Sequence, residues 1–358
     1  MKKNNYSRRD FLKKSVISTS GIVGLNSFAH DNDRFINNVV NNEQIINDKS
    51  ISKLPRQIWI SAISQDGIRA KNSMEMVSKI LDILKSNIID YHPDIICLPE
   101  IFPFVNIEEN VVSLEKKVEI SLEVVEQLSL FAKQNKCYVI CPVYTSEKGK
   151  IYNSAVIIDR IGNKLGEYRK IYTTEDETND GVTPGSKTLP IFKTDFGNIG
   201  IQICYDIMWD DSWKQLSEKG AEIIFWPSAF AGGQMVNAKA WQNMSVIVSS
   251  TWKNTSKICD ITGEVIAETG NYSKNIVCAP VNLEKTFLHS WPGYLQFEKI
   301  KKKYGRKIQI TTFHEEEWSI IESLSPDVRV ADILKEFNLR TKRKLLQDSE
   351  KVQDKARL

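Results

Sequence analysis

The sequence has 358 residues, of which 41% are hydrophobic and 26% are charged. That length and balance are enough for one large α/β domain or two small ones. The formal charge is +3, but residues 1–29 hold six basic residues and one acidic residue, so the rest of the chain carries −2. A body so close to neutral argues against nucleic acid or an anionic membrane surface as the partner.

Residues 1–29 have the composition of a targeting segment. Paired arginines in Ser7-Arg8-Arg9-Asp10-Phe11-Leu12-Lys13 precede a mildly apolar stretch that ends in Ser27-Phe28-Ala29, which has small residues at the −3 and −1 positions of a cleavage site. The stretch is too short to span a bilayer, and no later segment approaches about 20 apolar residues. It resembles a twin-arginine export signal, which implies a periplasmic or secreted protein that engages the twin-arginine translocase; a disordered basic tail is the alternative. Residues 30–52 are rich in Asn and Asp and are expected to be a disordered spacer.

Hydrophobic periodicity predicts alternating strands and helices over most of the remaining chain. Strands are expected at 57–64, 94–98, 137–144, 152–159, 164–170, 199–204, 223–227, 246–251, 256–260, 264–269 and, as the last, 276–281. Helices are expected around 77–88, 122–131, 211–219 and 234–244. This order predicts one α/β domain over about 53–285, with a mixed sheet layered against helices.

Beyond residue 285 the composition shifts toward charged residues. The segment 286–358 is therefore expected to be a partly helical C-terminal extension, with apolar residues at loose helical spacing after Ala331. We expect a solvated helix that packs on the body or on a partner subunit. Nucleic-acid binding is disfavoured because acidic residues are interleaved with the basic residues of this segment.

Three reactive side chains stand at the ends of predicted strands: Glu100, Lys170 and Cys204. A thiol that attacks a carbonyl or nitrile carbon needs a base, which a desolvated Glu100 can supply. The oxyanion that forms needs donors, which Lys170 and the N–H of Tyr205 can supply. Each residue also has a plain structural interpretation: a solvated loop carboxylate, a surface charge and a core thiol.

The cysteines and histidines do not suggest a metal site. The spacing of the six cysteines matches neither a zinc site nor a small disulfide framework, and the four histidines are scattered. Cys97, Cys137 and Cys141 lie in apolar runs and are expected to be buried thiols.

Four segments taken together resemble the nitrilase, or carbon–nitrogen hydrolase, superfamily. They are Asp94-Ile-Ile-Cys-Leu-Pro-Glu100, Gly166-Glu-Tyr-Arg-Lys170, Gly197-Asn-Ile-Gly-Ile-Gln-Ile-Cys-Tyr-Asp206 and Gly220-Ala-Glu-Ile-Ile-Phe-Trp-Pro-Ser-Ala-Phe230, with Thr183-Pro184-Gly185 between the second and third. The resemblance spans about residues 56–282 and implies a four-layer αββα sandwich.

The resemblance also implies roles for individual residues. Glu100 would be the general base, Lys170 the oxyanion stabiliser and Cys204 the nucleophile. A second glutamate is expected after the lysine; Glu177 is the first choice and Glu175 the competitor. Tyr205, Ser228 and Phe230 are expected to contact substrate. No metal or organic cofactor is implied, and a homodimer or higher homo-oligomer is expected.

Two departures from the common family pattern bear on substrate. Tyr172 stands where the family often has His, and Ile207-Met-Trp-Asp-Asp211 replaces a stretch that often carries Arg, so recognition of a substrate carboxylate there is not expected. The Cys204-Tyr-Asp206 sequence favours an amide over a nitrile. The expected function is hydrolysis of a small-molecule amide or N-carbamoyl bond; a nitrilase, an acyl transferase and a catalytically inactive exported binding protein are the alternatives.

Overall fold

The computed structural model describes residues 54, 56–110, 113–270 and 275–358. The predicted export signal and spacer, residues 1–52, lie outside the described residues. Residues 53–358 form one compact unit. In the described ranges no helix is long and apolar enough to cross a bilayer.

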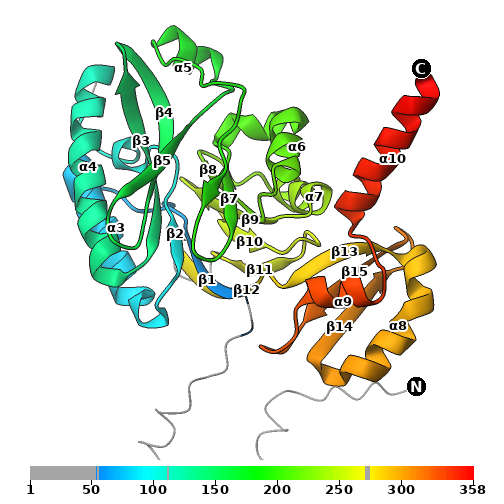
Figure 1. Cartoon of the computed structure of the whole chain (residues 1–358). Helices are drawn as coiled ribbons and strands as arrows, with labels where there is room; N and C mark the ends of the chain where they lie inside the picture. The colour runs from blue at the N-terminus through cyan, green and yellow to red at the C-terminus, as the bar shows by residue number, and fades with distance from the viewer. Residues whose placement is uncertain (1–53, 55, 111–112, 271–274) are drawn as a thin grey trace, which may run out of the picture. The chain divides into compact units, whose positions relative to one another are not determined.

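Two six-stranded sheets form the centre of this unit (Figure 1). The first has the strand order β12-β1-β2-β3-β4-β5 and the second has the order β11-β10-β9-β8-β7-β6. Strands β1, β2 and β3 are mutually parallel, as are β7, β8 and β9, whereas the outer strands of both sheets are antiparallel. The strands are β1 Gln57–Ile63, β2 Ile95–Cys97, β3 Tyr138–Glu147, β4 Lys150–Ile158, β5 Lys164–Arg169, β6 Phe192–Lys193, β7 Asn198–Ile201, β8 Ile223–Ser228, β9 Val246–Thr251, β10 Lys257–Cys259, β11 Val265–Glu268 and β12 Ile276–Asn282.

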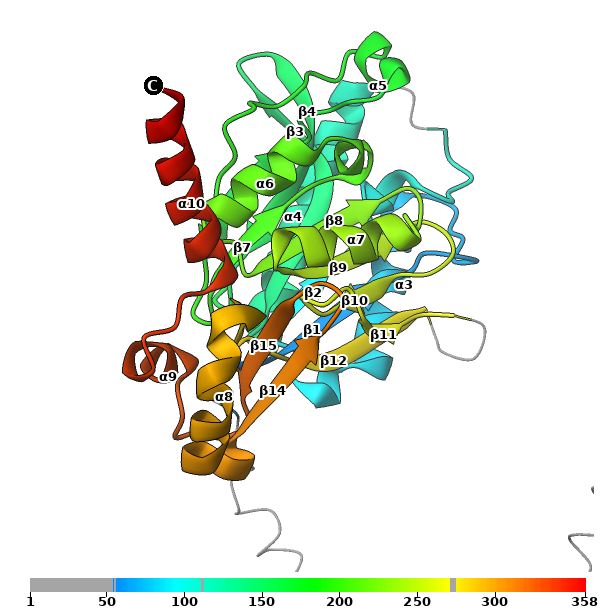
Figure 2. The same cartoon turned by 90° about the vertical axis from the view of Figure 1, so that its right-hand side faces the viewer.

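Helices cover the outer face of each sheet (Figures 1 and 2). Helices α3 (Ser73–Asn87) and α4 (Leu114–Asn135) pack on the first sheet, and α6 (Asp210–Glu218) and α7 (Gln234–Asn243) pack on the second. Met76, Val77, Ile80 and Leu84 line the buried face of α3 at helical spacing. The predicted α/β class and αββα layering are confirmed.

The inner faces of the two sheets share a core. Ile60, Ile95 and Ile140 of the first sheet belong to the same buried cluster as Ile199 and Ile223 of the second. The continuous apolar runs of the central strands follow from this arrangement, because parallel strands here are covered on both faces.

Cys204 is not part of a strand, contrary to the prediction for 199–204. Strand β7 ends at Ile201, and Cys204 opens the 3-10 turn η3 (Cys204–Met208) with a φ of 46°. The alternation of apolar residues through Ile203 continues past the strand because Ile203 is still buried. The remaining 3-10 turns are η1 (Ile89–Tyr91), η2 (Phe102–Phe104) and η4 (Gly305–Lys307).

The prediction that 276–281 is the last strand is wrong. Strands β13 (Lys285–His289), β14 (Ile308–Phe313) and β15 (Trp318–Ser323) form a third sheet in the order β13-β15-β14. These strands are short and mix apolar residues with Lys, Gln and Glu, so the charged composition hid their period of two. The predicted domain boundary at 285 stays a prediction.

Helices α8 (Ser290–Tyr304), α9 (Val330–Glu336) and α10 (Lys342–Arg357) complete the C-terminal region. Lys342, at the start of α10, is buried with its Nζ 4.3 Å from the ring centre of Trp318 and 5.1 Å from that of Phe287. These contacts attach the first turn of α10 to the third sheet, and the rest of α10 runs alongside α6 (Figure 2).

Candidate active site

Turns after three strands bring Glu100, Lys170 and Cys204 into one buried site. Glu100 follows β2, Lys170 follows β5 directly, and Cys204 follows β7. Their exposed fractions are 2%, 2% and 7%. Two tryptophan side chains hydrogen-bond to the backbone at Glu100 and Cys204. The Trp252 indole N–H donates to the carbonyl oxygen of Glu100, and the Trp226 indole N–H donates to the carbonyl oxygen of Cys204 at 3.0 Å.

One ammonium group joins two carboxylates. Lys170 Nζ lies 2.9 Å from Glu100 Oε1 and 2.7 Å from Glu177 Oε2. Burial alone would lower the pKa of Lys170, but the charges of Glu100 and of Glu177 raise it well above its usual value. The ammonium therefore stays protonated at all physiological pH values.

Of the two candidate glutamates, Glu177 is the one that contacts Lys170. Glu177 is the third residue of α5 (Glu175–Asn179), and it forms a capping box with Thr174 that turns its carboxylate back toward Lys170. Although burial opposes ionisation, Lys170 lowers the pKa of Glu177. Glu175 is exposed. The sequence Thr174-Glu-Asp-Glu177 is itself a capping-box signature and could have indicated which glutamate points inward.

Cys204 has a strained backbone and a protected thiol. A positive φ is uncommon outside glycine, and Ile101, next to Glu100, also has one, at 36°. Burial, together with the charge of Glu100, raises the pKa of the Cys204 thiol to about 12, although Lys170, the N–H of Ala229 and the Ser228 hydroxyl oppose the rise. The thiol is therefore protonated at neutral pH, and attack by its sulfur requires a nearby base.

Asn153, which the sequence analysis did not single out, contacts both carboxylates. Its Nδ2 lies 2.8 Å from Glu100 Oε1 and 2.8 Å from Glu177 Oε1. Its backbone oxygen accepts the N–H of Lys170 at 2.8 Å. One feature of the sequence could have indicated Asn153: it is a polar residue inside β4, and the residues that follow it through Ile158 are buried and almost all apolar.

Asp206 joins the turn of Cys204 to the segment after Lys170. Its carboxylate accepts from the hydroxyl of Tyr168 and from the N–H groups of Ile203 and Tyr172, at 2.7, 2.7 and 2.8 Å. Complete burial raises the pKa of Asp206 to about 7, although these three donors oppose the rise. Asp206 belongs to the Cys204-Tyr-Asp206 motif, but only the structure shows which groups donate hydrogen bonds to its carboxylate.

The three residues expected to contact substrate occupy different environments. Ser228 is fully buried and interacts with Cys204, whereas the side chain of Tyr205 is 37% exposed. Phe230 packs edge-on against Trp226. Tyr205 also packs edge-on against Trp209, which stacks on Tyr172 with ring centres 4.1 Å apart.

Two buried acceptor atoms in this site have no hydrogen-bond donor among the described residues. They are Glu100 Oε2 and Asn153 Oδ1. The two side chains are joined by the hydrogen bond from Asn153 Nδ2 to the other Glu100 oxygen, Oε1. An unsatisfied buried acceptor costs about 1–3 kcal/mol, so the site is suited to a molecule that donates hydrogen bonds.

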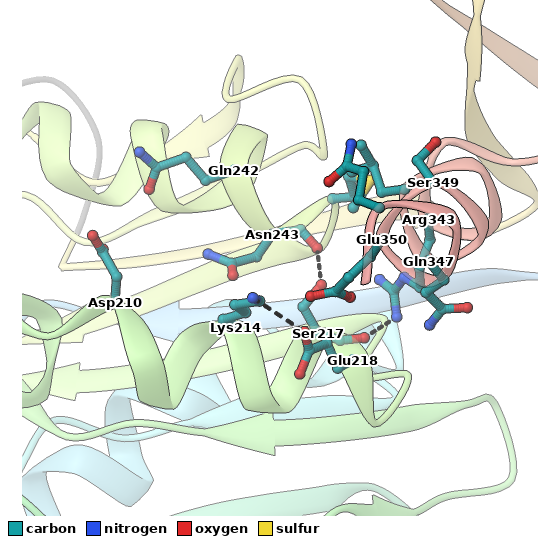
Figure 3. Close-up of a pocket in the computed structure, with 13 residues that line it drawn as sticks. Asp210, Lys214, Ser217, Glu218, Gln242, Asn243, Arg343, Gln347, Ser349 and Glu350 are labelled. Atoms are coloured by element: carbon teal, nitrogen blue, oxygen red, sulfur yellow. Dashed lines mark hydrogen bonds and ion pairs between the residues drawn. The ribbon is translucent and has the colours of Figure 1, made fainter. Parts of the chain in front are cut away.

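A separate cavity of about 500 Å³ lies between α6, α7 and α10 (Figure 3). Its lining includes Lys214, Glu218, Arg343 and Glu350 and none of the residues that surround Cys204. Arg343 donates to the backbone oxygen of Ser217 on α6 (Figure 3). The cavity therefore lies between α10 and the two helices α6 and α7, and it does not reach the site of Cys204.

Comparison with known proteins identifies relatives of this chain. The family model described as carbon-nitrogen hydrolase matches residues 60–287. Deaminated glutathione amidase of Synechocystis sp. is 31% identical over 151 residues, which are 38% of this chain and 54% of the relative. N-carbamoylputrescine amidase of Arabidopsis thaliana is 27% identical over 190 residues, 43% of this chain and 64% of the relative. The chain thus spans little more than half the length of these relatives.

Solved structures share the fold. An amidase from Nesterenkonia sp. superposes with a TM-score of 0.57 at 16% identity, over 65% of this chain and 94% of that chain. A carbon–nitrogen hydrolase from Helicobacter pylori gives a TM-score of 0.57 at 17% identity, over 70% and 94%. Since the family model covers more than half of the sequence, the chain belongs to the carbon–nitrogen hydrolase family.

Proposed function

We propose that this protein hydrolyses an amide or N-carbamoyl bond of a small molecule through a thioester on Cys204. The observation that carries the proposal is the ion-pair group of buried Glu100 and Lys170 with partly buried Glu177, beside a buried thiol on a strained turn. Such an arrangement supplies a nucleophile, a base and a fixed positive charge, which together suit acyl transfer.

The first half of the reaction forms the thioester. Glu100 takes the proton of Cys204 as the sulfur attacks the carbonyl carbon, because the pKa of the free thiol is far above neutrality. The new S–C bond turns the carbonyl oxygen into an oxyanion, which the Lys170 ammonium and the Tyr205 N–H stabilise. The C–N bond then breaks, and Glu100 returns the proton to the leaving ammonia or amine.

The second half hydrolyses the thioester. Glu100 takes a proton from water, the hydroxide oxygen attacks the thioester carbon, and the C–S bond breaks. The proton passes from Glu100 to the Cys204 sulfur, so the enzyme returns to its starting state. Each step uses only water as a co-reactant.

The unpartnered acceptors support an amide substrate over a nitrile. A primary amide or carbamoyl group has two N–H donors, which Glu100 Oε2 and Asn153 Oδ1 can accept. A nitrile has none and leaves both buried acceptors unsatisfied. The names of the similar proteins also point this way, and a Nesterenkonia amidase of the same fold carries the acetamide moiety of fluoroacetamide at its active-site cysteine.

Ammonia release from a panel of amides and N-carbamoyl compounds tests the proposal. Cys204→Ala is expected to abolish turnover without unfolding the protein, whereas Cys278→Ala, a change at a partly buried thiol outside the site, is expected to retain it. Full activity in the Cys204→Ala variant would refute the mechanism. Assaying an aromatic nitrile beside its amide tests substrate class, since faster turnover of the nitrile would make the protein a nitrilase.

Export through the twin-arginine route to the periplasm or outside the cell is part of the same proposal. All six cysteines are free thiols, and five of them are buried. A chain exported unfolded into an oxidising space would risk random disulfides, whereas the twin-arginine route carries folded proteins. Redirecting the chain through a signal for unfolded export is expected to lower activity and free-thiol content; equal values would count against the route.

Homo-oligomer formation is also proposed, on the family resemblance alone. Sedimentation of the purified protein tests it, with a mass above 40.9 kDa expected for a dimer or larger assembly. A single species at the mass of one chain would refute it.

A further inference from the structure

Two carboxylates share one ammonium in the site, and this arrangement needs a further donor. Glu100 and Glu177 both form ion pairs with Lys170, so the three groups carry a net charge of −1; Glu100 and Lys170 are buried and Glu177 is partly buried. Two carboxylates held this close repel each other and favour uptake of a proton by one of them. A protonated Glu100 could not act as the base.

Asn153 supplies donors to both carboxylates without adding charge. Its Nδ2 carries two N–H groups, and it lies 2.8 Å from Glu100 Oε1 and 2.8 Å from Glu177 Oε1. Its backbone oxygen accepts a hydrogen bond from the backbone N–H of Lys170, with an N···O distance of 2.8 Å. One residue of β4 thus contacts every charged member of the group.

These bonds also decide which oxygen of Glu100 is free. Oε1 accepts from both Asn153 and Lys170, whereas Oε2 has no donor among the residues that the structure describes. Occupation of Oε1 on two sides fixes the plane of the carboxylate. The free Oε2 is then the atom available to receive a proton.

We propose that Asn153 is a positioning residue that holds Glu100 and Glu177 ionised around Lys170 and presents Glu100 Oε2 as the proton acceptor. The proposal rests on the proposed function and deepens it. Asn153 acts through Glu100 and Glu177, so its loss should affect the chemical step more than substrate binding. The lowered pKa of Glu177, which burial opposes and Lys170 chiefly produces, has the Asn153 bond among its causes.

Two substitutions separate this role from simple packing. Asn153→Ala removes the donors and leaves a small cavity, whereas Asn153→Asp keeps the shape and puts a third carboxylate against the other two. A packing role predicts that the Asp variant is the milder. The proposed role predicts that Asn153→Asp is at least as impaired as Asn153→Ala at neutral pH.

Asn282 provides a matched control outside the site. It is buried, and its Nδ2 donates to the Glu322 carboxylate at 2.9 Å and to the Ser323 oxygen at 2.8 Å. Asn282→Ala and Asn282→Asp should lower thermal stability and leave kcat nearly unchanged. Stability losses at the two positions then show how much of any rate loss comes from the fold.

The primary measurement is the rate at which iodoacetamide alkylates Cys204, because it needs no knowledge of the substrate. Asn153→Ala should lower this rate, and kcat for an amide, by about 10- to 100-fold, with KM changed by less than about threefold. The acid limb of the kcat/KM profile should move to higher pH, since the ionised carboxylates have lost their donors. Both Asn282 variants should match the wild type.

Several outcomes would overturn the proposal. Alkylation and kcat in Asn153→Ala within about twofold of the wild type would do so, as would an Asp variant clearly more active than the Ala variant. If Asn153→Ala does not fold, the isosteric Asp variant carries the comparison alone. A Cys204→Ala variant that still turns over would instead refute the proposed function, whatever the Asn153 variants do.

Discussion

Replacing Glu177 with glutamine tests the charge arrangement most directly. The change keeps the shape of the side chain but removes its negative charge. Glu177 Oε2 accepts from Lys170 Nζ and the Thr174 N–H, and Oε1 accepts from Asn153. Both carboxylate oxygens accept hydrogen bonds, so the NH2 group of a glutamine would replace an acceptor with a donor and would face at least one donor group.

The expected loss follows from these contacts. Removing a partner of a buried ion pair costs about 3–5 kcal/mol, but Lys170 keeps Glu100 as a partner, so the lower value applies. If this cost falls on the transition state, about 3 kcal/mol corresponds to a rate loss of roughly 100-fold. Glu175→Gln is the matched control on the same helix, because its side chain is exposed.

Ammonia release under saturating amide, with KM measured separately, gives the answer. Glu177→Gln should lose roughly 100-fold in kcat, and Glu175→Gln should stay within about twofold of the wild type. Thermal melts of both variants account for loss of the α5 capping box. Equal activity of the two variants would show that Glu177 does not support the reaction.

Three more changes probe the same site. Glu100→Gln cannot accept a proton, so kcat should fall by at least about 100-fold, and an unaltered rate would remove Glu100 as the base. Burial raises the pKa of Asp206 to about 7, so between about pH 4 and pH 7 the folded state holds a proton that the unfolded chain releases. Over this range the free energy of unfolding should therefore fall with rising pH, by an amount on the order of 4 kcal/mol, and it should stay level above about pH 7. Denaturant titrations should show that Asp206→Asn removes this slope, and parallel wild-type and variant curves would contradict it. A Cβ at Gly185 would overlap the carbonyl of Arg169, so Gly185→Ala should displace the segment bonded to Lys170, with a loss of about 1–3 kcal/mol in stability and reduced kcat; a variant with wild-type melting and turnover would contradict this packing argument.

Local patterns explain why the strands and the three central residues could be predicted. Short apolar runs bounded by polar residues predicted the central strands, and Glu100, Lys170 and Cys204 stood at the ends of predicted strands. The resemblance to the carbon–nitrogen hydrolase family then singled out these three residues. The error at 199–204 arose because burial of Ile203 continues the alternation after the strand has ended. The third sheet was missed because its short strands lie in a strongly charged context.

From the sequence by itself, periodicity predicted the alternating strands and helices, since periodicity is a local property, and the resemblance of four segments to the carbon–nitrogen hydrolase family implied the αββα layers and the candidate reactive residues. Only the tertiary structure decided how these groups are joined. The ion pairs of Lys170 with two glutamates, the hydrogen bonds from Asn153 to both carboxylates and the hydrogen bonds that Asp206 accepts from Tyr168 and Tyr172 all join separate elements of the chain. No local pattern encodes such contacts, because they depend on where the two sheets place the ends of their strands.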